Sequence, residues 1–484
     1  MCFFSFWYLQ HLFKLKEIDL SFSSLTSCPD LSGFPNLERL ILGFCKSLKG
    51  VPDCRGLISL KGLYLMWCSN LEKLPEMPCN IGELLLSGTA IEELPLSTKY
   101  LSRLVVLDIS DCRRLKRLPS SICEWKSLKA LYLEGCTKLD ELPDDIGTLE
   151  SLVALSIYKT AIRELPSSIT KLKNVDFLLF KRFEVQDAVS WSLPRIEGWH
   201  NLTTLSLRDS GIIELPDNLG CLSSLIELDL AGNCFESIPA SIANLSNLLN
   251  LNIYNCKMLK CLPKLKLRQI HAYNCTSLEV LSCVSFKSCF QPRDNYIFAN
   301  FGNCFKLDRN TFEDIVKDVL LKIHGPIEYI DEGYKYRLAR SVACYPGHKI
   351  PEWFNFRSMG SLINVELPQN CNNHNFIGFV MCVVLAVPCL DHQVKFYRRR
   401  LHWKCNLKSK DGHPCIRGGS FYYNFNRLKV IGSHHVFVAS NCKISPYELL
   451  CYENEISFQF YFDDSIEGYT VEKCGVHLMF AQLP

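Results

Sequence analysis

The sequence lacks the short motifs that mark common catalytic and cofactor sites. It contains no GxxxxGK[ST] phosphate loop, no HExxH helix, no GxSxG nucleophile turn and no kinase motif set. Its twelve histidines match the spacing of no closed zinc site, and no CxxC pair occurs. We therefore predict a protein that is not an enzyme and that requires neither a cofactor nor a metal.

Long apolar runs and a strong net charge are lacking as well. The longest apolar run, Phe376 to Leu390, is too short to span a bilayer and contains Pro388. A formal net charge of +3 gives no bulk attraction to nucleic acid or to a membrane. One basic run, residues 395–410, contains no acid; a solvated hairpin is the favoured interpretation, and a targeting or nucleic-acid role is the alternative. We expect no membrane span and no nucleic-acid partner.

Cysteine is abundant, with 26 residues in the chain. The cysteines form no dense framework, and a chain of 484 residues can bury a core without disulfides. The apolar first ten residues have neither a basic start nor a clear cleavage site, so we predict no signal peptide. Reduced thiols and a cytoplasmic location follow as expectations, with the nucleus as an alternative.

A repeated stretch dominates the sequence. Residues 128–143, LKALYLEGCTKLDELP, place leucine at the first, fourth and sixth positions and end in Leu-Pro. Similar stretches recur with a spacing of 19 to 27 residues, which is the signature of a leucine-rich repeat. The twelve stretches begin at residues 15, 37, 60, 81, 104, 128, 152, 175, 202, 225, 248 and 267.

The spacing within a repeat predicts its local structure. Alternation at the end of LxxLxL suits a short strand in which Leu131 and Leu133 point inward and Tyr132 points outward. Stacked repeats share one core and form a parallel sheet on the concave side, with the Leu-Pro element on the convex side. Small residues with a donor recur at the eighth residue after each start, where they would bond the backbone as a ladder. These ladder residues include Cys45, Cys68, Thr89, Cys112, Cys136, Thr160, Ser210, Asn233, Cys256 and Cys275.

The remainder of the chain does not follow the repeat pattern. We predict an N-terminal edge at 1–14, a solenoid at 15–286, a linker at 287–295 and a second domain at 296–484. The second domain begins with an amphipathic helix capped by Asn310 and Glu313 and continues with many short strands, which favour a β-sandwich. The fold class is α/β, a leucine-rich repeat solenoid followed by a mostly β jelly-roll or Ig-like sandwich. The irregular repeat at 175–201 either carries a binding loop or is a tolerated irregularity.

Aromatic and basic residues gather on the predicted inner face of the solenoid. Such side chains dominate protein-recognition hot spots, although single aromatic side chains scattered over a surface do not indicate a binding site. Asp229 is the one close acid among the outward positions, so a basic centre is expected to bind an acidic or mixed protein surface. The candidate binding residues are Tyr64, Trp67, Tyr132, Tyr158, Lys159, Lys181, Arg182, Arg208, Tyr254 and Tyr273.

Three stretches after the repeats are distinctive: FGNCFKL at 301–307, YPGHKIPEWF at 345–354 and VEKCGVHL at 471–478. Together with the CxxLxxLP repeat endings, they resemble the plant immune receptors of the TIR-type NB-LRR (TNL) family and their post-repeat C-JID domain. The second stretch suits a rigid turn with core aromatics, and a site role is the alternative. The motif residues are Asn303, Cys304, Pro346, Gly347, Ile350, Pro351, Trp353 and Phe354.

This resemblance implies the sensor portion of an intracellular receptor. The implied partner is a pathogen effector or a guarded host protein, contacted by repeats and post-repeat domain together. The family carries TIR and nucleotide-binding domains ahead of the repeats, and neither is recognisable in this sequence. The alternative is an extracellular leucine-rich repeat ectodomain that binds a peptide or protein, which would need a secretion signal and disulfide caps.

Overall fold

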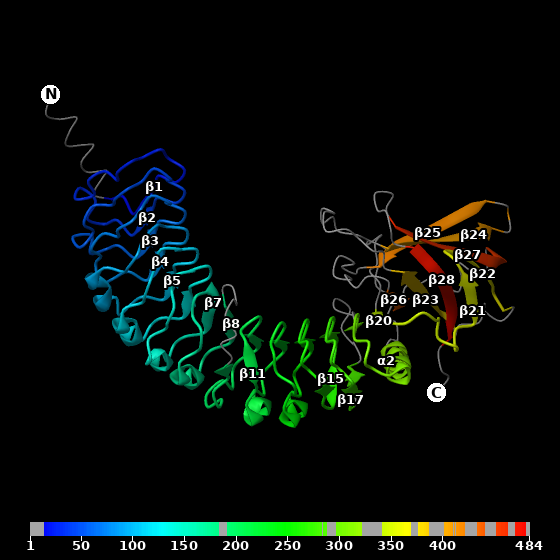
Figure 1. Ribbon diagram of the computed structural model, residues 1–484. Coiled ribbons are helices and arrows are strands. Elements are labelled where there is room, and N and C mark those ends of the chain that lie inside the picture. Colours follow the sequence, from blue (N-terminus) through cyan, green and yellow to red (C-terminus); the bar gives the residue numbers. More distant parts are fainter. Residues whose placement is uncertain are drawn as a thin grey trace. The chain divides into compact units, whose positions relative to one another are not determined.

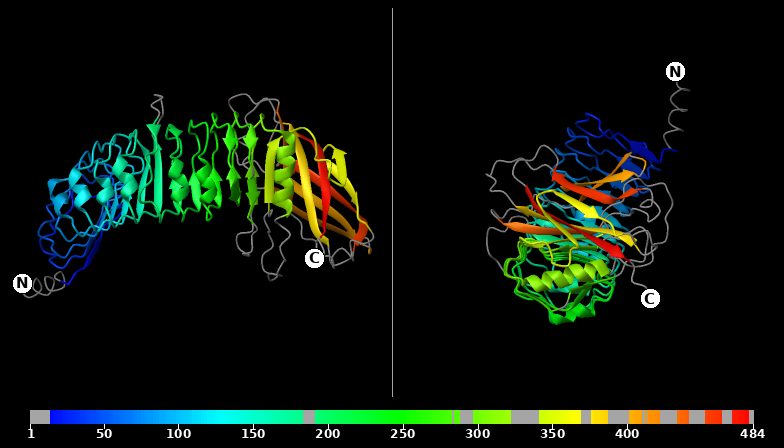
Figure 2. Two further views of the ribbon diagram at one scale, coloured as in Figure 1. Left: turned by 90° about the horizontal axis from the view of Figure 1, so that it is seen from below. Right: turned by 90° about the vertical axis from the view of Figure 1, so that its right-hand side faces the viewer.

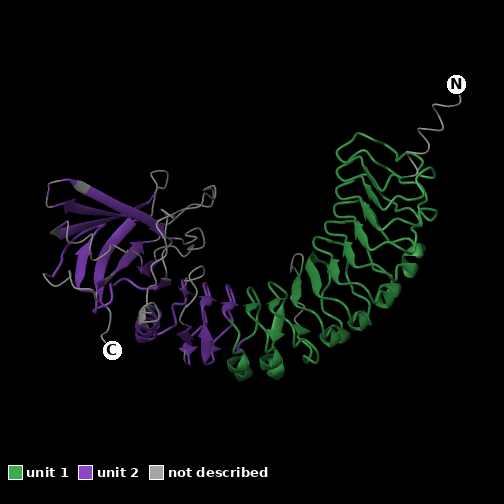
Figure 3. Ribbon diagram, turned by 180° about the vertical axis from the view of Figure 1, so that it is seen from behind, with its two compact units in different colours: residues 1–235, 239–248 green, residues 236–238, 249–484 purple. Residues whose placement is uncertain are grey.

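The computed structural model describes most of the chain in two compact units. The first comprises residues 1–235 and 239–248, and the second comprises residues 236–238 and 249–484 (Figure 3). The described residues are 14–182, 191–282, 284–287, 297–321, 341–368, 376–386, 401–409, 411, 413–421, 433–440, 452–462 and 470–480.

The first unit is a stack of repeats whose strands form one parallel sheet (Figure 1). Most strands have three residues, one residue earlier in the repeat than the sequence predicted for Leu40–Leu42 and Leu131–Leu133. The strands are β1 (Glu17–Asp19), β2 (Arg39–Ile41), β3 (Gly62–Tyr64), β4 (Glu83–Leu85), β5 (Val106–Asp108), β6 (Ala130–Tyr132), β7 (Ala154–Thr160), β8 (Phe177–Arg182), β10 (Thr204–Ser206) and β12 (Glu227–Asp229).

The register of this sheet aligns the core positions of every repeat. Leu131 lies opposite Leu107 on one side and Leu155 on the other, and all three are fully buried. Tyr132 is only half-buried, as the alternation of a strand requires. Because each repeat buries its apolar face against its neighbours, the core runs along the stack and is confirmed as a solenoid core.

Short 3₁₀ helices cover the side of the repeats away from the sheet. Proline precedes five of them, and its carbonyl accepts the first helical bond, as Pro119 does from the Ile122 N–H at 3.0 Å. Proline has no N–H to lose at this place and its fixed φ suits the turn. The helices are η1 (Leu96–Tyr100), η2 (Ser120–Glu124), η3 (Ile146–Thr148), η4 (Ser167–Lys171), η5 (Asp217–Cys221) and η6 (Ala240–Asn244).

The irregular repeat contributes two tryptophans to the first unit. Trp199 is fully buried, and its indole N–H donates to the Ile169 carbonyl at 2.9 Å. Trp191 packs edge-on against Phe180 and forms β9 (Trp191–Ser192) beside β11 (Ile212–Glu214). These residues serve the core, while the predicted loop residues 183–190 lie outside the described residues.

The second unit begins with further repeats. Strands β13 (Asn250–Asn252), β16 (Gln269–His271) and β19 (Ile297–Asn300) pair in parallel, and β19 pairs in parallel with β20 (Ser341–Pro346). The parallel pairing therefore extends beyond residue 286, where the sequence predicted the repeats to end. The predicted linker falls almost wholly outside the described residues, so that boundary stays a prediction. Beside this sheet lie β14 (Cys261–Leu262), β15 (Leu265–Leu267), β17 (Val280–Leu281) and β18 (Val284–Phe286).

A β-sandwich completes the second unit (Figure 2). One sheet runs β20–β26–β23–β28–β21 and the other runs β22–β27–β24–β25, with all of these pairs antiparallel. Inward residues of both sheets, such as Phe379 and Phe458, form one buried cluster and confirm the predicted mostly β domain. The strands are β21 (Phe356–Met359), β22 (Leu362–Glu366), β23 (Phe376–Ala386), β24 (Leu401–Ser409), β25 (Pro414–Phe421), β26 (His434–Ser440), β27 (Tyr452–Phe462) and β28 (Thr470–Phe480).

One α-helix, α2 (Arg309–Leu321), lies against β18 and β20. Its apolar stripe is buried as predicted, with Phe312 stacked on Tyr345 at 4.9 Å between ring centroids. The predicted cap at Asn310 is wrong: the Asp308 carboxylate accepts the Asn310 N–H at 3.1 Å, and the helix starts one residue earlier. Within the described ranges, no helix is long and apolar enough to cross a bilayer.

Candidate protein-binding face

A ladder of short polar side chains holds the turn after each strand. The thiol of Cys68 donates to the Leu42 carbonyl at 3.0 Å, and Asn233 Nδ2 donates to the Leu207 carbonyl at 2.7 Å. Burial raises the pKa of the Cys68 thiol to about 11, which keeps it protonated as a donor. Equivalent bonds from a buried side chain to a carbonyl of the preceding repeat are made by Cys45, Cys112, Cys136, Ser210 and Cys275. Thr89 bonds the Cys112 thiol, Thr160 bonds a carbonyl of its own repeat, and Cys256 is buried.

The residue directly before each ladder residue adopts a left-handed conformation. Its φ is +72° at Gly88 and +73° at Gly135, where glycine meets no steric penalty. The same conformation occurs at Phe22, Phe44 and Trp67, although bulky side chains rarely adopt it. The turn therefore holds these side chains at a fixed place beside the strands, and such backbone strain clusters at functional positions.

Three of these strained residues form an exposed aromatic row. The rings of Phe22 and Phe44 stack at 4.7 Å with 3° between their planes, and a Cβ at Gly88 would lie 2.5 Å from the ring of Trp67. Phe22 is 76% exposed and Trp67 is 43% exposed. Trp67 is among the binding residues predicted from the sequence and Phe22 is not, although both occupy the seventh place after a repeat start.

A second cluster surrounds Tyr158 at the ends of the longer strands β7 and β8. Tyr158 and Lys181 are register partners, and Lys181 Nζ lies 5.4 Å from the centroid of the Tyr158 ring. Lys159 Nζ lies 5.6 Å from the same ring. Cations over an aromatic face are held by the ring quadrupole, so the cluster presents an aromatic ring in contact with two ammonium groups. We name Tyr158, Lys159, Lys181 and Arg208 the inner-face cluster.

The charge of this cluster is partly neutralised, contrary to expectation. Asp209 forms ion pairs with Lys181 at 2.7 Å and with Arg208 at 3.4 Å. The close acid predicted from the sequence is Asp229, whereas the acid in the structure is Asp209, which occupies the left-handed place of its repeat. Three cations and one carboxylate leave the group with a net positive charge of two units, which is smaller than predicted.

Two candidate residues are not on the surface. Arg182 is 7% exposed and Tyr273 is 3% exposed, so the expectation that both are available to a partner is wrong. The alternation along β8 places Arg182 on the buried side, opposite the buried Thr160, and the register shift lies in β7 between Tyr158 and Thr160. Tyr273 packs in the buried cluster that contains the sandwich residues, with its ring 5.5 Å from that of Tyr254.

The remaining candidates on the inner face are half-buried. Tyr64 donates its hydroxyl to the Glu83 carboxylate at 2.5 Å, which fixes the ring along the strands. Tyr132 and Tyr254 are also of intermediate exposure. The structure thus brings Tyr158, Lys159, Lys181 and Arg208 together and leaves the other exposed candidates spread over neighbouring repeats.

The first post-repeat motif connects the last repeats to the sandwich within the second unit. The Cys304 thiol donates to the Ala272 carbonyl at 3.1 Å, so it continues the ladder. Asn303 donates its side-chain N–H to the Tyr273 hydroxyl at 3.0 Å and its backbone N–H to His435 Nε2 at 3.1 Å. This motif therefore has a structural explanation as a further repeat turn.

The second motif packs into the sandwich. Pro346 ends β20, and a Cβ at Gly347 would lie 3.0 Å from Val436. Ile350 and Phe354 are buried over Gly475, where a Cβ would lie 2.9 Å from Ile350. Pro351 is buried as well, and Trp353 meets Phe354 at 4.4 Å between ring centroids. These contacts suit the predicted turn with core aromatics.

Within the described ranges, no group of three or more histidine, cysteine, aspartate or glutamate side chains is placed to hold a metal. The cysteines described in the structure are free thiols, and Cys79, Cys221 and Cys234 are exposed. The two aromatic clusters are therefore the candidate protein-binding features of this face.

The stacked repeats and the sandwich define a leucine-rich repeat protein with a mostly β domain after its repeats. Family models match residues 56–141 as "Disease resistance protein RPS4B-like, leucine-rich repeats", residues 224–245 as a leucine-rich repeat and residues 345–484 as a C-JID domain. The chain carries the leucine-rich repeat and C-JID regions of the plant TIR-type disease resistance proteins.

The curated relatives are disease resistance proteins. The Disease resistance-like protein DSC1 of Arabidopsis thaliana is 32% identical over 432 residues, covering 83% of this chain and 34% of that protein. The TMV resistance protein N of Nicotiana glutinosa is 33% identical over 417 residues, covering 77% of this chain and 35% of that protein. Among solved structures, the leucine-rich repeat protein LIC12759 of Leptospira interrogans is 21% identical with a TM-score of 0.36, covering 65% of this chain and 96% of that one. The chain spans about a third of the length of the curated relatives it matches.

Proposed function

We propose that this chain is the recognition portion of an intracellular plant immune receptor and acts by binding a pathogen effector or a guarded host protein. The relatives are disease resistance proteins, which supports a role in plant immunity. The observation that carries the proposal is the inner-face cluster, in which the ammonium groups of Lys159 on β7 and Lys181 on the adjacent β8 lie over the Tyr158 ring. Rigid aromatic and basic side chains are the usual anchors of protein interfaces.

The chemistry of the cluster indicates the kind of partner surface. Its net positive charge favours an acidic or mixed surface, and the ion pairs through Asp209 hold Lys181 and Arg208 in place before binding. Preorganised side chains lose less conformational entropy when a complex forms. The row of Phe22, Phe44 and Trp67 supplies a second, apolar contact on the same unit. Leucine-rich repeat and C-JID domains are typically non-catalytic, and we propose binding without catalysis.

Replacing Tyr158 with alanine tests this proposal. We expect Tyr158→Ala to weaken binding of the cognate effector or guarded protein by about 1–2 kcal/mol, because the ring anchors two cations. The measurement is a pull-down from effector libraries followed by titration calorimetry of the captured partner. Arg182→Ala is unsuitable because burial makes it a stability variant.

The repeats provide a matched control for this variant. Tyr100 is 62% exposed at the end of η1, and Lys99 Nζ lies 4.8 Å from its ring centroid. Tyr100→Ala removes a similar aromatic–lysine pair from a 3₁₀ helix instead of the strands, so partner affinity should remain unchanged. Loss of affinity in Tyr100→Ala with none in Tyr158→Ala would reject the inner-face cluster as the binding site.

We also propose a cytoplasmic location, with the nucleus as an alternative. Counting free thiols distinguishes this proposal from the hypothesis of an extracellular ectodomain. All 26 cysteines should react with a thiol reagent after denaturation without reductant. Before denaturation, the exposed Cys79, Cys221 and Cys234 should react first. A count reduced by several pairs of cysteines would favour the secreted ectodomain instead.

A further inference from the structure

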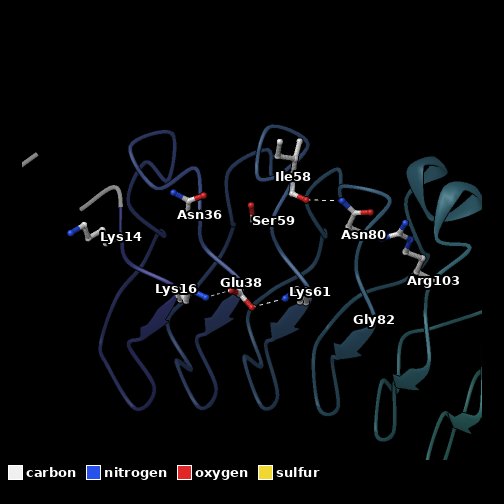
Figure 4. A pocket seen from close by; sticks show the side chains of 10 residues that line it. All are labelled: Lys14, Lys16, Asn36, Glu38, Ile58, Ser59, Lys61, Asn80, Gly82 and Arg103. Carbon is white, nitrogen blue, oxygen red and sulfur yellow. Dashed lines mark hydrogen bonds and ion pairs between the residues drawn. The ribbon is translucent and has the colours of Figure 1, made fainter. Parts of the chain in front are cut away.

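A pocket of about 800 Å³ opens at the edge of the first unit where strands β1 to β4 begin (Figure 4). Two rows of residues line it, one directly before and one directly after each repeat start. The first row consists of Lys14, Asn36, Ser59, Asn80 and Arg103. The second row consists of Lys16, Glu38, Lys61 and Gly82. The pocket lies away from the inner-face cluster and has no part in the function proposed above.

Positive charge predominates in this pocket. Lys16 Nζ and Lys61 Nζ both contact the Glu38 carboxylate, at 2.8 Å and 2.6 Å (Figure 4). Lys14 and Arg103 lie at opposite ends of the pocket and have no ion-pair partner among the described residues. Four cations and one carboxylate give the lining a net charge of three positive units. Each lysine ammonium has three N–H donors, so Lys16 and Lys61 each keep two donors beyond the bond to Glu38.

The backbone leaves room for a ligand between these charges. Gly82 stands in the row where the preceding repeats carry Lys16, Glu38 and Lys61, and no side-chain atom lies within 4 Å of where its Cβ would be. The second row is therefore open beside Lys61. Asn80 donates its side-chain N–H to the Ile58 carbonyl at 2.7 Å, while the Ile58 side chain is 68% exposed at the rim. The volume lies within the usual range of small-molecule sites, roughly 300–1,000 Å³.

The identity of the cations narrows the class of ligand. Three of the four are lysines, which act as point charges and do not select the planar geometry of a carboxylate. A phosphate monoester carries a charge of about −1.5 to −2, so two such groups balance the lining. Lys16 and Lys61 both contact the Glu38 carboxylate, so their ammonium groups lie close enough together to contact neighbouring phosphate groups of one compact ligand. We propose that this pocket binds a compact ligand that carries at least two phosphate groups.

Titration calorimetry with inorganic triphosphate on the full chain at low salt tests the proposal. Wild-type protein should bind triphosphate more tightly than citrate, a carboxylate anion of comparable charge. The double variant Lys16→Ala/Lys61→Ala should lose affinity at least about tenfold, since each lysine contributes a charge-assisted contact. Lys129→Ala is the matched control, because Lys129 is an exposed lysine at the same place of a later repeat and does not line the pocket.

A variant that binds triphosphate more tightly gives a further test, because misfolding would weaken binding and not strengthen it. Glu38→Gln removes the one carboxylate from the lining, so triphosphate should bind several-fold more tightly and the affinity should fall with added salt. The proposal is overturned if triphosphate does not bind, if the double variant binds as well as wild type, or if Glu38→Gln has no effect. Citrate binding as tightly as triphosphate would also overturn it, since the site would then not select phosphate.

The source of the phosphate groups is resolved by a second arm. Vesicles of phosphatidylcholine with and without phosphatidylinositol bisphosphate are mixed with wild-type and variant proteins and sedimented. Binding to the phosphorylated vesicles that the double variant loses would support the same chemistry and assign a lipid headgroup as its source. Binding of triphosphate without vesicle binding would support a soluble ligand.

Discussion

Acidification from about pH 7 to about pH 4 is expected to reduce the free energy of unfolding of the second unit by about 3 kcal/mol through His435 alone. Burial of the imidazole lowers the pKa of His435 from 6.5 to about 4, and the neighbouring His434 contributes to the same direction. The side chain is fully buried on β26. Such a site holds the neutral ring and disfavours the charged one.

The sign of this pH effect on stability follows from the protonation of His435 in the folded and unfolded states. In the folded protein His435 Nε2 accepts the Asn303 N–H at 3.1 Å, which requires that nitrogen to be unprotonated. The unfolded chain takes up a proton near pH 6.5, whereas the folded chain resists it until about pH 4. Stability from this group is therefore complete above pH 6.5 and is lost progressively as the pH falls through 4. Ser433, near Nδ1 at 3.5 Å, and the ring of Phe305, at 6.0 Å, are neutral and do not offset this loss.

Chemical denaturation at a series of pH values, followed by a probe in the second unit, measures this dependence. His435→Gln keeps an acceptor for the Asn303 N–H but cannot titrate, so its stability should depend less steeply on pH between 6.5 and 4. His348→Gln is the control, because His348 is exposed. Parallel pH profiles for wild type and His435→Gln would show that the buried imidazole does not carry the effect.

The repeat architecture could be predicted because each repeat restates the same physical requirement. Leu131 and Leu133 must be buried and Cys136 must satisfy a carbonyl of the preceding repeat, and the same residue types recur at these places. A period repeated twelve times averages out the ambiguity of any single stretch. The same regularity would have identified Phe22, which occupies the place of Phe44 and Trp67.

The details of the binding face could not be predicted, because they depend on departures from the period. Strand β8 continues beyond the three residues usual in this sheet, and the alternation along it places Arg182 in the core. Lys181 and Asp209 are far apart in sequence and meet only because adjacent repeats are stacked in this register. Tyr273 is buried by contacts with the sandwich, which a repeat pattern alone does not contain.

Replacing Gly147 with alanine is expected to destabilise the first unit by about 3 kcal/mol, at the upper end of the cost of overpacking. Gly147 lies in η3, where its N–H donates to Ser168 Oγ at 3.2 Å. A Cβ at this place would lie 1.9 Å from the carbonyl oxygen of Ser168 in η4, far inside van der Waals contact. The obstacle is backbone, so it cannot be relieved by a change of rotamer. Gly220 meets Ser241 in the same way at 2.1 Å, which shows that the close approach is built into the stacking of the 3₁₀ helices.

Gly56→Ala is the matched control for this variant. No heavy atom lies within 4 Å of where its Cβ would be, and its φ lies outside the left-handed region. Alanine there should be neutral or stabilise the fold by up to about 1 kcal/mol, because it restricts the unfolded chain. Urea denaturation of the two variants gives the comparison, and hydrogen exchange should show increased opening around η3 and η4, since a solenoid couples mainly nearest neighbours. Equal stability of Gly147→Ala and Gly56→Ala would mean that the 3₁₀ helices can separate freely, and the tight stacking would then not be a source of stability.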